Sequence, residues 1–426
     1  MKISKYNSVI EISNKYNLFY NSLNDSFMLS RKNFNISLEA NAKELKMLVD
    51  KGFIIDDLIN EDDILRNRAN SIILQDSSFH LTINPTLDCN FNCWYCYEQK
   101  AKGAVMEENV LSSVIKLLTK LGKEYKHIHI SFFGGEPLLG FQNVVIPIFK
   151  SLKVICKEYN CDYSTSFTTN GGLISNRILS YLETVRVKNM QITIDGHRHF
   201  HDKTRYFTNQ KGSYDIIFNN IVKLLKRKIS VTIRVNYTPE NIHSIHNVSD
   251  DIIKIIPKEL RCLLIVRFHQ VWQTTNVDLT SEVDEQIEYL TEKGIRALRP
   301  IFNNVYNPCY ADYKNSALIN YNGDVFKCTA VDFLNTKRDG YLSKNGEIVW
   351  ENNSAEKRIN SRFKNESCNN CRIQPICNGG CSQKALQWGG KNYCILGFDE
   401  AKKDKIIKDR FVALLHSKRI NEIQKK

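Results

Sequence analysis

The sequence predicts an α/β protein whose centre is a parallel sheet curled into a partial (β/α)6 barrel. Three observations predict this fold. Between residues 79 and 299 the spacing of apolar residues switches repeatedly between two and about 3.6, which is typical of strands that alternate with helices. Six strand–helix pairs follow one another in this way. The segments rich in cysteine, glycine and asparagine come directly after strands, where parallel α/β proteins carry their functional loops.

The elements of the barrel follow from runs with these two periods. The predicted strands are His80–Pro85, His127–Phe133, Tyr163–Thr169, Met190–Asp195, Ser230–Tyr237 and Cys262–Gln270. The predicted helices are Glu107–Leu121, Gln142–Glu158, Ser175–Thr184, Tyr214–Lys226, Asn241–Ile256 and Ser281–Leu298. Because strand and helix alternate throughout, the strands are expected to be parallel and the helices to cover the outside of the sheet.

Three further segments flank the predicted barrel of residues 79–299. Residues 1–78 predict a small α+β extension with short strands and two helices, which serves either as a peptide-binding unit or as a cap on the barrel. Residues 300–400 lose the periodicity and contain many cysteines, as expected for a domain held together by metal ligands. Residues 401–426 predict a basic helical tail.

Composition and charge exclude several classes of protein. Of the 426 residues, 42% are hydrophobic and 25% are charged, which excludes collagen-like, coiled-coil and disordered chains. The formal net charge is +13, but lysine and arginine are spread along the whole chain, so we expect a solvated surface and no nucleic-acid partner. Neither a signal-peptide pattern nor a run of eighteen apolar residues occurs, so we expect a cytoplasmic protein without a membrane partner.

The chain has 13 cysteines, and ten of them fall into two groups. In the cytoplasm thiols stay reduced, so clustered cysteines there usually bind metal or take part in catalysis. The three cysteines outside the groups, Cys156, Cys161 and Cys262, lie in apolar or strand-like surroundings and are expected to be buried without a role. Metal or redox chemistry is therefore the expected function of the other ten.

The first group is Cys89-x3-Cys93-x2-Cys96, in the loop after the first barrel strand. These spacings allow three thiolates to converge on one small inorganic centre. A structural zinc site would need a fourth ligand, and no cysteine or histidine follows at a usual spacing within the next thirty residues. A cubane iron–sulfur cluster held by three cysteines leaves one iron open to bind a ligand. The spacing favours the cluster and leaves zinc as the alternative.

With the aromatic Tyr95 before its last cysteine, this triplet resembles that of the radical S-adenosylmethionine (SAM) superfamily. The Gly-Gly-Glu-Pro turn after the second strand resembles the motif that holds the amino group of SAM, and glycine carbonyls can accept from an ammonium. The ends of the third and fourth strands resemble the segments around the SAM carboxylate and ribose. The resemblance thus assigns these residues to SAM: Tyr95, Gly134, Gly135, Glu136, Pro137, Ser166 and Asp195.

The resemblance implies an enzyme that cleaves SAM reductively. In that family the open iron chelates SAM, an electron from the cluster breaks a sulfur–carbon bond, and the resulting 5′-deoxyadenosyl radical removes a hydrogen atom from the substrate. The protein positions the target hydrogen and excludes water. A low-potential electron donor such as flavodoxin or ferredoxin is implied as a partner.

The second group of cysteines resembles the SPASM domain, a carboxyl-terminal extension of radical SAM enzymes with two auxiliary clusters. The resemblance therefore implies three [4Fe-4S] clusters in all. Carried over by position, one auxiliary cluster takes Cys368, Cys371, Cys377 and Cys394, and the other takes Cys309, Cys328 and Cys381. Since no cysteine lies between Cys262 and Cys309 to complete it, the latter would have an open iron. A non-catalytic protein with zinc ribbons is the remote alternative.

The segment after Asp195 narrows the implied substrate. His201-Asp202, Arg205 and Gly212-Ser213-Tyr214 resemble a pattern common to peptide maturases. The resemblance thus implies an oxidoreductase-type maturase that cross-links or epimerises a ribosomally synthesised peptide whose leader binds the amino-terminal extension. The alternative is an anaerobic sulfatase-maturing enzyme, which forms formylglycine. Thr329 stands where that branch has an aspartate, and its extra early cysteine is missing. No catalytic acid or base is assigned.

Overall fold

The computed structural model describes residues 1–302, 305–389 and 391–425. The chain forms two compact units that are not consecutive in sequence. The first unit comprises residues 1–75, 301–315 and 355–414, and the second comprises residues 76–300, 316–354 and 415–426. The boundaries therefore differ from the four predicted segments. Residues 303, 304, 390 and 426, which belong to the last two of those segments, lie outside the described residues.

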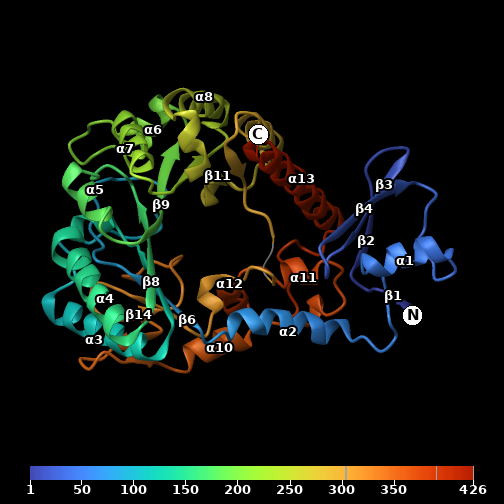
Figure 1. Ribbon diagram of the computed structural model, residues 1–426, viewed down its shortest axis with the longest axis horizontal. Helices are drawn as coiled ribbons and strands as arrows, with labels where there is room; N and C mark the ends of the chain where they lie inside the picture. Colours follow the sequence, from blue (N-terminus) through green and yellow to red (C-terminus); the bar gives the residue numbers. More distant parts are fainter. Residues whose placement is uncertain (303–304, 390, 426) are drawn as a thin grey trace. The chain divides into compact units, whose positions relative to one another are not determined.

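The second unit contains an open sheet in the order β12-β11-β10-β9-β8-β7-β6-β13-β14-β15-β16 (Figure 1). Strands β6 to β13 pair in parallel and the last three pair antiparallel. The strands are β6 (Ser78–Ile83), β7 (His127–Phe132), β8 (Asp162–Thr169), β9 (Val187–Asp195), β10 (Val231–Tyr237), β11 (Leu264–Gln270), β12 (Arg296–Leu298), β13 (Ser316–Ile319), β14 (Asp324–Phe326), β15 (Gly340–Leu342) and β16 (Ile348–Trp350). The predicted α/β partial barrel is confirmed.

Helices follow the strands of this sheet in the predicted order, with Arg198–Thr204 as an additional helix that was not predicted. They are α3 (Glu108–Glu124), α4 (Ile146–Tyr159), α5 (Asn176–Leu182), α6 (Arg198–Thr204), α7 (Tyr214–Lys226), α8 (Ile245–Ile255) and α9 (Thr280–Glu292), and short 3-10 and π turns at residues 137–145 lead into α4. One predicted boundary is wrong. The helix expected over Ser281–Leu298 ends at Glu292, because Gly294 takes a positive φ of 77° and the chain then continues as β12.

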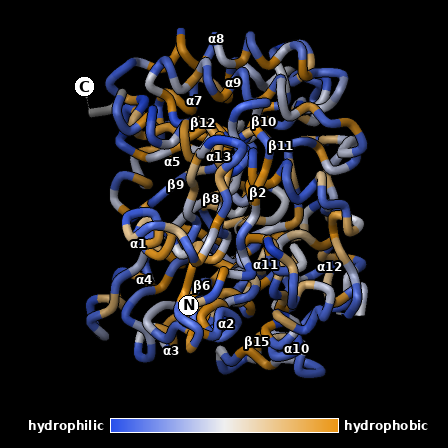
Figure 2. The backbone as a smooth tube through the Cα atoms, turned by 90° about the vertical axis from the view of Figure 1, so that its right-hand side faces the viewer, coloured by the Kyte–Doolittle hydropathy of each residue, from blue (hydrophilic) through white to orange (hydrophobic). Residues whose placement is uncertain are grey.

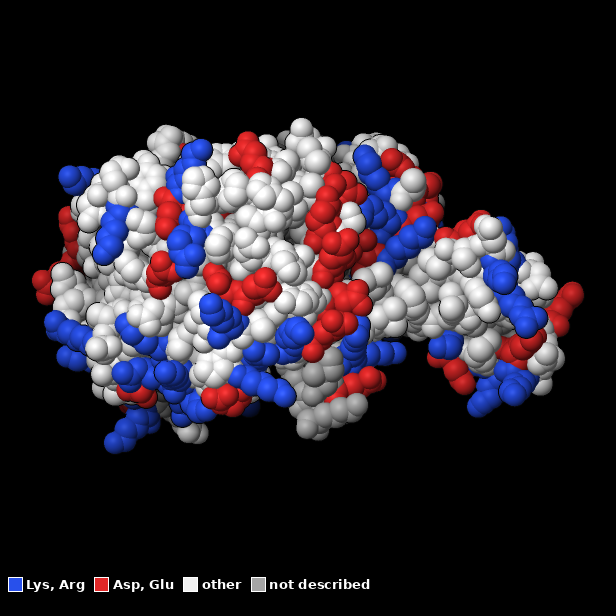
Figure 3. Space-filling model, turned by 90° about the horizontal axis from the view of Figure 1, so that it is seen from above, with Lys and Arg blue, Asp and Glu red and all other residues white. Residues whose placement is uncertain are grey.

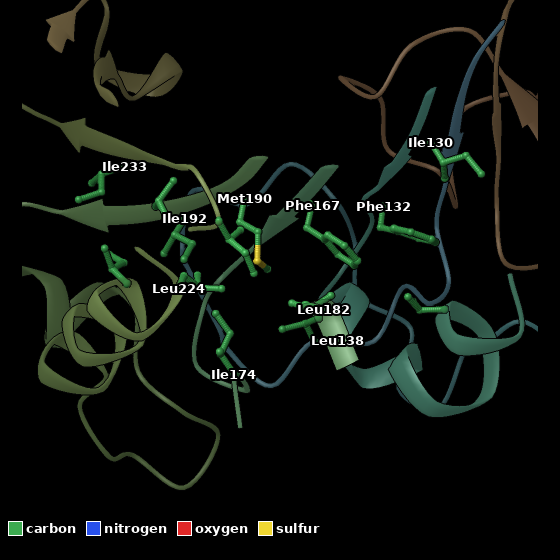
Figure 4. Close-up of a cluster of buried hydrophobic side chains, with 14 of the residues drawn as sticks. Ile130, Phe132, Leu138, Phe167, Ile174, Leu182, Met190, Ile192, Leu224 and Ile233 are labelled. Atoms are coloured by element: carbon green, nitrogen blue, oxygen red, sulfur yellow. The ribbon is translucent and has the colours of Figure 1, made fainter. Parts of the chain in front are cut away.

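The core of the second unit lies between the outer face of the sheet and these helices. Alternate side chains of each strand point into it, as Figure 4 shows for Phe132 of β7, Phe167 of β8 and Ile192 of β9. Figure 2 shows apolar residues alternating with hydrophilic ones along the chain. Burial of one face of each strand and one stripe of each helix holds the barrel together.

The segment Pro137–Tyr159 is long and apolar enough to cross a membrane by length and composition alone. Half of its most apolar window is buried inside the structure. Val144, Phe149 and Leu152 belong to the core between the sheet and its helices. These contacts are typical of a helix in the core of a globular protein, and such helices can also meet the criterion of length and composition.

Residues 316–354 belong to the barrel rather than to a separate cysteine-rich domain. Strand β13 pairs in parallel with β6 through Ser316–His80 and Ile319–Ile83, and β14 to β16 extend the sheet from there. Backbone pairing with the first barrel strand accounts for this placement, which the sequence pattern did not indicate.

The first unit has the predicted α+β character. Its strands β2 (Asn7–Glu11), β3 (Tyr16–Asn21) and β4 (Ser26–Arg31) form an antiparallel sheet, and β1 (Lys2–Ile3) pairs with β5 (Ile54–Ile55). Its helices are α1 (Ala42–Asp50), α2 (Glu61–Ile73), α10 (Ser354–Asn360), α11 (Gln374–Cys377), α12 (Ser382–Gln387) and much of α13 (Glu400–Lys425). Tyr20 of β3, Ile376 of α11 and Ile407 of α13 share one apolar cluster, so segments from both ends of the chain fold together.

The charged side chains on the visible face support the expectation of a dispersed charge. In Figure 3, lysine and arginine are interspersed with aspartate and glutamate. The three cysteines outside the two groups are less buried than expected. Cys262 is exposed, and Cys156 and Cys161 are half-buried with their sulfur atoms 3.2 Å apart. The expectation of burial is therefore wrong for Cys262, which lies in a turn before β11.

The inner face of the sheet is polar. His80 of β6 and His127 and His129 of β7 form a histidine cluster. His129 of β7 contacts the hydroxyl of Ser164 at 2.9 Å and that of Ser166 at 3.1 Å, both on β8. Burial, followed by the fields of His80 and Lys188, lowers the pKa of His129 to about 4. The folded protein therefore keeps this imidazole neutral at a pH where an unfolded chain would protonate it.

We expect the cluster-free protein to lose stability in mild acid through His129. The unfolded chain binds a proton below about pH 6.5 and the folded one only near its lowered pKa, so folding stability should fall by ~2 kcal/mol between about pH 7 and about pH 5. Urea denaturation of the wild type and of His129→Gln at both pH values measures this. Identical losses in the two proteins would contradict the assignment.

Candidate functional site

The cysteine loop follows β6 and is fixed by Asp88. The Asp88 carboxylate accepts hydrogen bonds from the backbone N–H of Cys89 at 2.8 Å and of Gly103 at 2.9 Å. The backbone carbonyl of Asp88 accepts a hydrogen bond from the N–H of Glu136 at 2.9 Å, and Glu136 lies in the turn after β7. Asp88 therefore ties the cysteine loop to the glycine-rich turn at the carboxyl edge of the sheet, as the predicted motif order requires.

The three thiols of the loop lie within electrostatic range of one another. Burial raises the pKa of Cys89 to about 12, with further contributions from Glu136 and Cys93. Burial also raises the pKa of Cys96, together with Glu98 and Cys93. Thiols in such surroundings stay protonated unless a cation compensates their charge, and bound iron ions reverse this preference. The donor set therefore fits a cationic iron–sulfur centre.

The Gly-Gly-Glu-Pro turn needs both of its glycines. Gly134 and Gly135 have positive φ angles of 78° and 48°. A Cβ atom on Gly134 would lie 2.5 Å from Cγ of Asn84, and one on Gly135 would lie 2.3 Å from the carbonyl oxygen of Asp88. The turn thus packs directly on the cysteine loop, and only glycine permits this approach.

Gly135→Ala should destabilise the protein by ~2 kcal/mol more than Gly103→Ala, because overpacking against backbone adds to the cost of a positive φ. Gly103 is a matched control, since its φ is 75° and nothing lies within 4 Å of an added Cβ. Urea denaturation, together with the iron content after reconstitution, measures the difference. Equal effects of the two substitutions would show that the close approach to Asp88 carries no energy.

Glu136 is fully buried, and its carboxylate connects the turn to the end of β8. Oε1 accepts from the N–H of Leu138 at 3.0 Å and from the hydroxyl of Thr169 at 2.7 Å. Oε2 accepts from the N–H of Asn170 at 2.7 Å. The structure thus gives Glu136 a supporting role, while the predicted contact of this motif with SAM stays a prediction.

Tyr95 and Asp195, predicted separately, meet in one hydrogen-bond network. The Tyr95 hydroxyl donates to Oδ2 of Asp195 at 2.5 Å and accepts from Nη1 of Arg205 at 2.8 Å and from Nδ2 of Asn236 at 3.1 Å. Burial raises the pKa of Asp195, against the opposing effect of Arg205. His201, which is fully buried, accepts from the N–H of Asp195 at 3.2 Å and holds the end of β9 in place.

Several buried polar atoms around the loop have no hydrogen-bond partner among the described residues. They include Oδ1 of Asp195, Nε of Arg205 and Oε1 of Glu98. Oε2 of the same Glu98 accepts from the N–H of Gly135 at 2.9 Å, and burial raises the pKa of this carboxyl to about 7. Buried acceptors and a buried donor without partners suit a ligand that carries both kinds of polar group, as SAM does. The residues present therefore fit SAM, the ligand that the resemblance implies.

The predicted contact of Ser166 with SAM stays a prediction, and Asn170 adds a polar group that was not predicted. Ser166 lies deeper on the inner face than the edge of β8, where its hydroxyl donates to Ser131 at 3.2 Å and contacts His129. Asn170, at the edge itself, was not predicted, although its Nδ2 lies 3.9 Å from the Cys89 sulfur and 2.7 Å from Oδ1 of Asn90. Asparagine directly after a strand was the available signal for it.

The second group of cysteines divides between the units. Cys368, Cys371, Cys377 and Cys394, the predicted ligands of one auxiliary cluster, all lie in the first unit. Burial raises the pKa of Cys377 to about 12, and the other three thiols add to this rise, so the four are neighbours. Cys309 and Cys381 belong to the first unit and Cys328 to the second, and their shared cluster stays a prediction.

No group of three or more histidine, cysteine, aspartate or glutamate side chains among the described residues is arranged to hold a single metal ion. A cubane cluster has a different requirement, since each thiolate binds its own iron.

The second unit thus combines a partial barrel with a cysteine triplet after its first strand and a glycine-rich turn after its second, an arrangement that suits an enzyme core that binds a cluster. Residues 83–252 match the family model described as the Radical SAM superfamily. This segment of the chain is therefore similar to the core of that superfamily.

One curated relative is the cysteine-type anaerobic sulfatase-maturating enzyme of Clostridium novyi, 24% identical over 343 residues, which span 71% of this chain and 88% of the relative. A solved structure of anSMEcpe with bound AdoMet has a TM-score of 0.59 at 19% identity and covers 81% of this chain and 99% of that one. SuiB of Streptococcus suis bound to precursor peptide SuiA has a TM-score of 0.53 at 16% identity and covers 91% of this chain and 96% of that one. The two structures support the fold.

Proposed function

We propose that this protein matures a ribosomally synthesised precursor peptide, forming a cross-link through sulfur or carbon or epimerising one residue. The observation that carries the proposal is the extent of the structural similarity. SuiB, solved with its precursor peptide, covers 91% of this chain, against 81% for anSMEcpe. The larger cover is what shared segments outside the barrel would produce, and the first unit of this chain consists of such segments.

The residues of the site have distinct parts in this function. Cys89, Cys93 and Cys96 would hold the SAM-binding cluster, and the network of Tyr95, Asp195 and Arg205 would orient SAM beside it. Bound together, cluster and SAM supply a carbon radical that removes a hydrogen atom. The glycine turn and the buried edge of the sheet keep water from that reaction.

The proposed function also requires auxiliary clusters and an electron donor. Two auxiliary [4Fe-4S] clusters would use the second group of cysteines, the first of them bound by Cys368, Cys371, Cys377 and Cys394. A low-potential donor of the flavodoxin or ferredoxin type would supply the electron. The free thiols and the reductive chemistry suit the reducing cytoplasm.

Co-expression with a candidate precursor, taken from any short open reading frame found beside this gene, tests the proposal. Mass spectrometry should find the loss of two hydrogen atoms for a cross-link, or uptake of one deuterium from heavy water for an epimer. The Cys96→Ala variant should give neither. An unmodified peptide in the presence of active, SAM-cleaving enzyme would contradict the proposal.

A sulfatase-maturing activity is the second candidate, favoured by the relative from Clostridium novyi that this chain spans to 88%. Thr329 stands where that branch has its aspartate, which speaks against it. Incubation with a cysteine-containing sulfatase peptide decides between the two. Formation of formylglycine would support the sulfatase reaction, and an unchanged peptide would exclude it.

A further inference from the structure

Basic side chains line the inner face of β10 and β11. In the parallel pairing of these strands Arg234 is directly opposite Arg267, and Asn236 is opposite His269. The side chains that alternate with them, among them Val235 and Val266, belong to the core on the outer face. Because side chains alternate between the faces of a strand, Arg234, Arg267 and His269 share the inner one.

Arg234 and Arg267 form no ion pair with a carboxylate in the part of the chain that the structure describes. Nε of Arg234 donates to Oδ1 of Asn236 at 2.9 Å, which is a neutral partner. Like charges directly opposite each other on neighbouring strands are destabilising. Burial lowers the pKa of Arg267, and Arg296 lowers it further. Burial also lowers the pKa of Arg234, where Arg205 adds to the effect and Asp195 opposes it. Each guanidinium therefore carries a cost of burial and of neighbouring positive charge that a bound anion would reduce.

His269 extends this basic pair and stays neutral beside it. Burial, then Arg234 and Arg267, lowers the pKa of His269 to about 3. A neutral imidazole can donate one hydrogen bond to an anion without adding a third repelling charge. The three side chains thus offer two cations and a neutral donor on one face.

The basic pair lies beside the cysteine loop. Asn236, which binds Arg234, also donates to the Tyr95 hydroxyl at 3.1 Å, and Gln273 donates to the Tyr95 carbonyl at 3.1 Å. The rings of Tyr97 and Trp272 stack at 5.4 Å, and these residues are 37% and 56% exposed. Exposed aromatic rings next to arginine are typical of a surface that binds a partner.

We propose that Arg234 and Arg267, with His269, bind a carboxylate of the peptide substrate at the mouth of the barrel, beside the stacked Tyr97 and Trp272. This inference rests on the proposed function, which makes the substrate a peptide. Arginine binds carboxylates through paired hydrogen bonds. The carboxylate is either an acidic side chain or the carboxyl terminus of the peptide, and the experiment distinguishes these sources.

Three fluorescent pentapeptides serve as probes for the reconstituted, SAM-loaded enzyme: Ala-Ala-Glu-Ala-Ala amide, Ala-Ala-Gln-Ala-Ala amide and Ala-Ala-Gln-Ala-Ala free acid. Fluorescence anisotropy should show at least about tenfold tighter binding of one charged probe than of the neutral amide. The preferred probe identifies the source of the carboxylate. Equal binding of all three probes by the wild type would overturn the proposal.

Substitutions assign the preference to this pair. Arg267→Gln and, separately, Arg234→Gln should abolish it, whereas Arg267→Lys should retain part of it because the charge remains. Arg177→Gln is the matched control, since Arg177 is exposed and bonds only to Gln142 among the described residues. Circular dichroism and iron content establish that each variant folds. Retention of the preference in both glutamine variants would overturn the proposal.

The failure of this inference can be told apart from the failure of the proposed function. If a precursor peptide is modified and Arg267→Gln leaves its KM unchanged, the carboxylate site is wrong and the function stands. If the probes show the expected preference and no peptide is modified, the proposed function is wrong and the site stands.

Discussion

Replacing Cys93 by alanine should abolish reductive cleavage of SAM, whereas replacing Cys377 by alanine should leave cleavage and remove the peptide product. Cys93 lies in electrostatic contact with Cys89, Cys96 and Arg205, at the centre of the candidate site. A cubane held by three thiolates cannot lose one and keep its open iron in place. Cys377 instead neighbours the thiols of the first unit, so its loss should spare the SAM-binding cluster.

The amount of 5′-deoxyadenosine formed with dithionite and the iron content per chain measure the two effects. We expect background 5′-deoxyadenosine with Cys93→Ala, whereas Cys377→Ala should still form 5′-deoxyadenosine but no modified peptide. Cys262→Ala is the matched control, because Cys262 is exposed and belongs to neither group. Full peptide modification by both of the first two variants would refute this division of labour.

The strands of the barrel could be predicted because burial imposes a period on the sequence. Strands β6 to β11 fall within a few residues of their expected positions, since each buries alternate side chains against the helices. The elements that were missed are short. Strand β12 has three residues and helix α6 has seven, which is too few to establish a period. Their existence depends on pairing and packing with segments far along the chain.

The same distinction applies to the candidate site. Cys89 and Gly135 were predictable because residue type and spacing within one loop carry the signal. Asn236 was not, because it lies 141 residues after Tyr95 and reaches it only through the register of β9 and β10. The opposed Arg234 and Arg267 likewise follow from strand register, which no local pattern in the sequence specifies.

Glu136→Ala should destabilise the protein by at least ~3 kcal/mol, because each buried donor left without an acceptor costs ~1–3 kcal/mol and this carboxylate serves three of them. The donors are the N–H groups of Leu138 and Asn170 and the hydroxyl of Thr169. Their loss would separate the glycine-rich turn from the end of β8. We therefore expect weaker SAM binding as well as a lower unfolding free energy, measured by calorimetric titration and by urea denaturation.

Glu136→Gln separates the two causes that the alanine variant combines. Glutamine keeps the size of the side chain and one acceptor, but its amide group would place a donor against the N–H of Asn170 or of Leu138. We expect a loss of stability between those of the wild type and of Glu136→Ala. Glu107→Gln is the control, because Glu107 is exposed and forms no capping hydrogen bond at the start of α3. If Glu136→Gln matched the wild type in stability and in SAM affinity, the carboxylate would not hold the turn to β8, and the turn would depend on Asp88 and the two glycines alone.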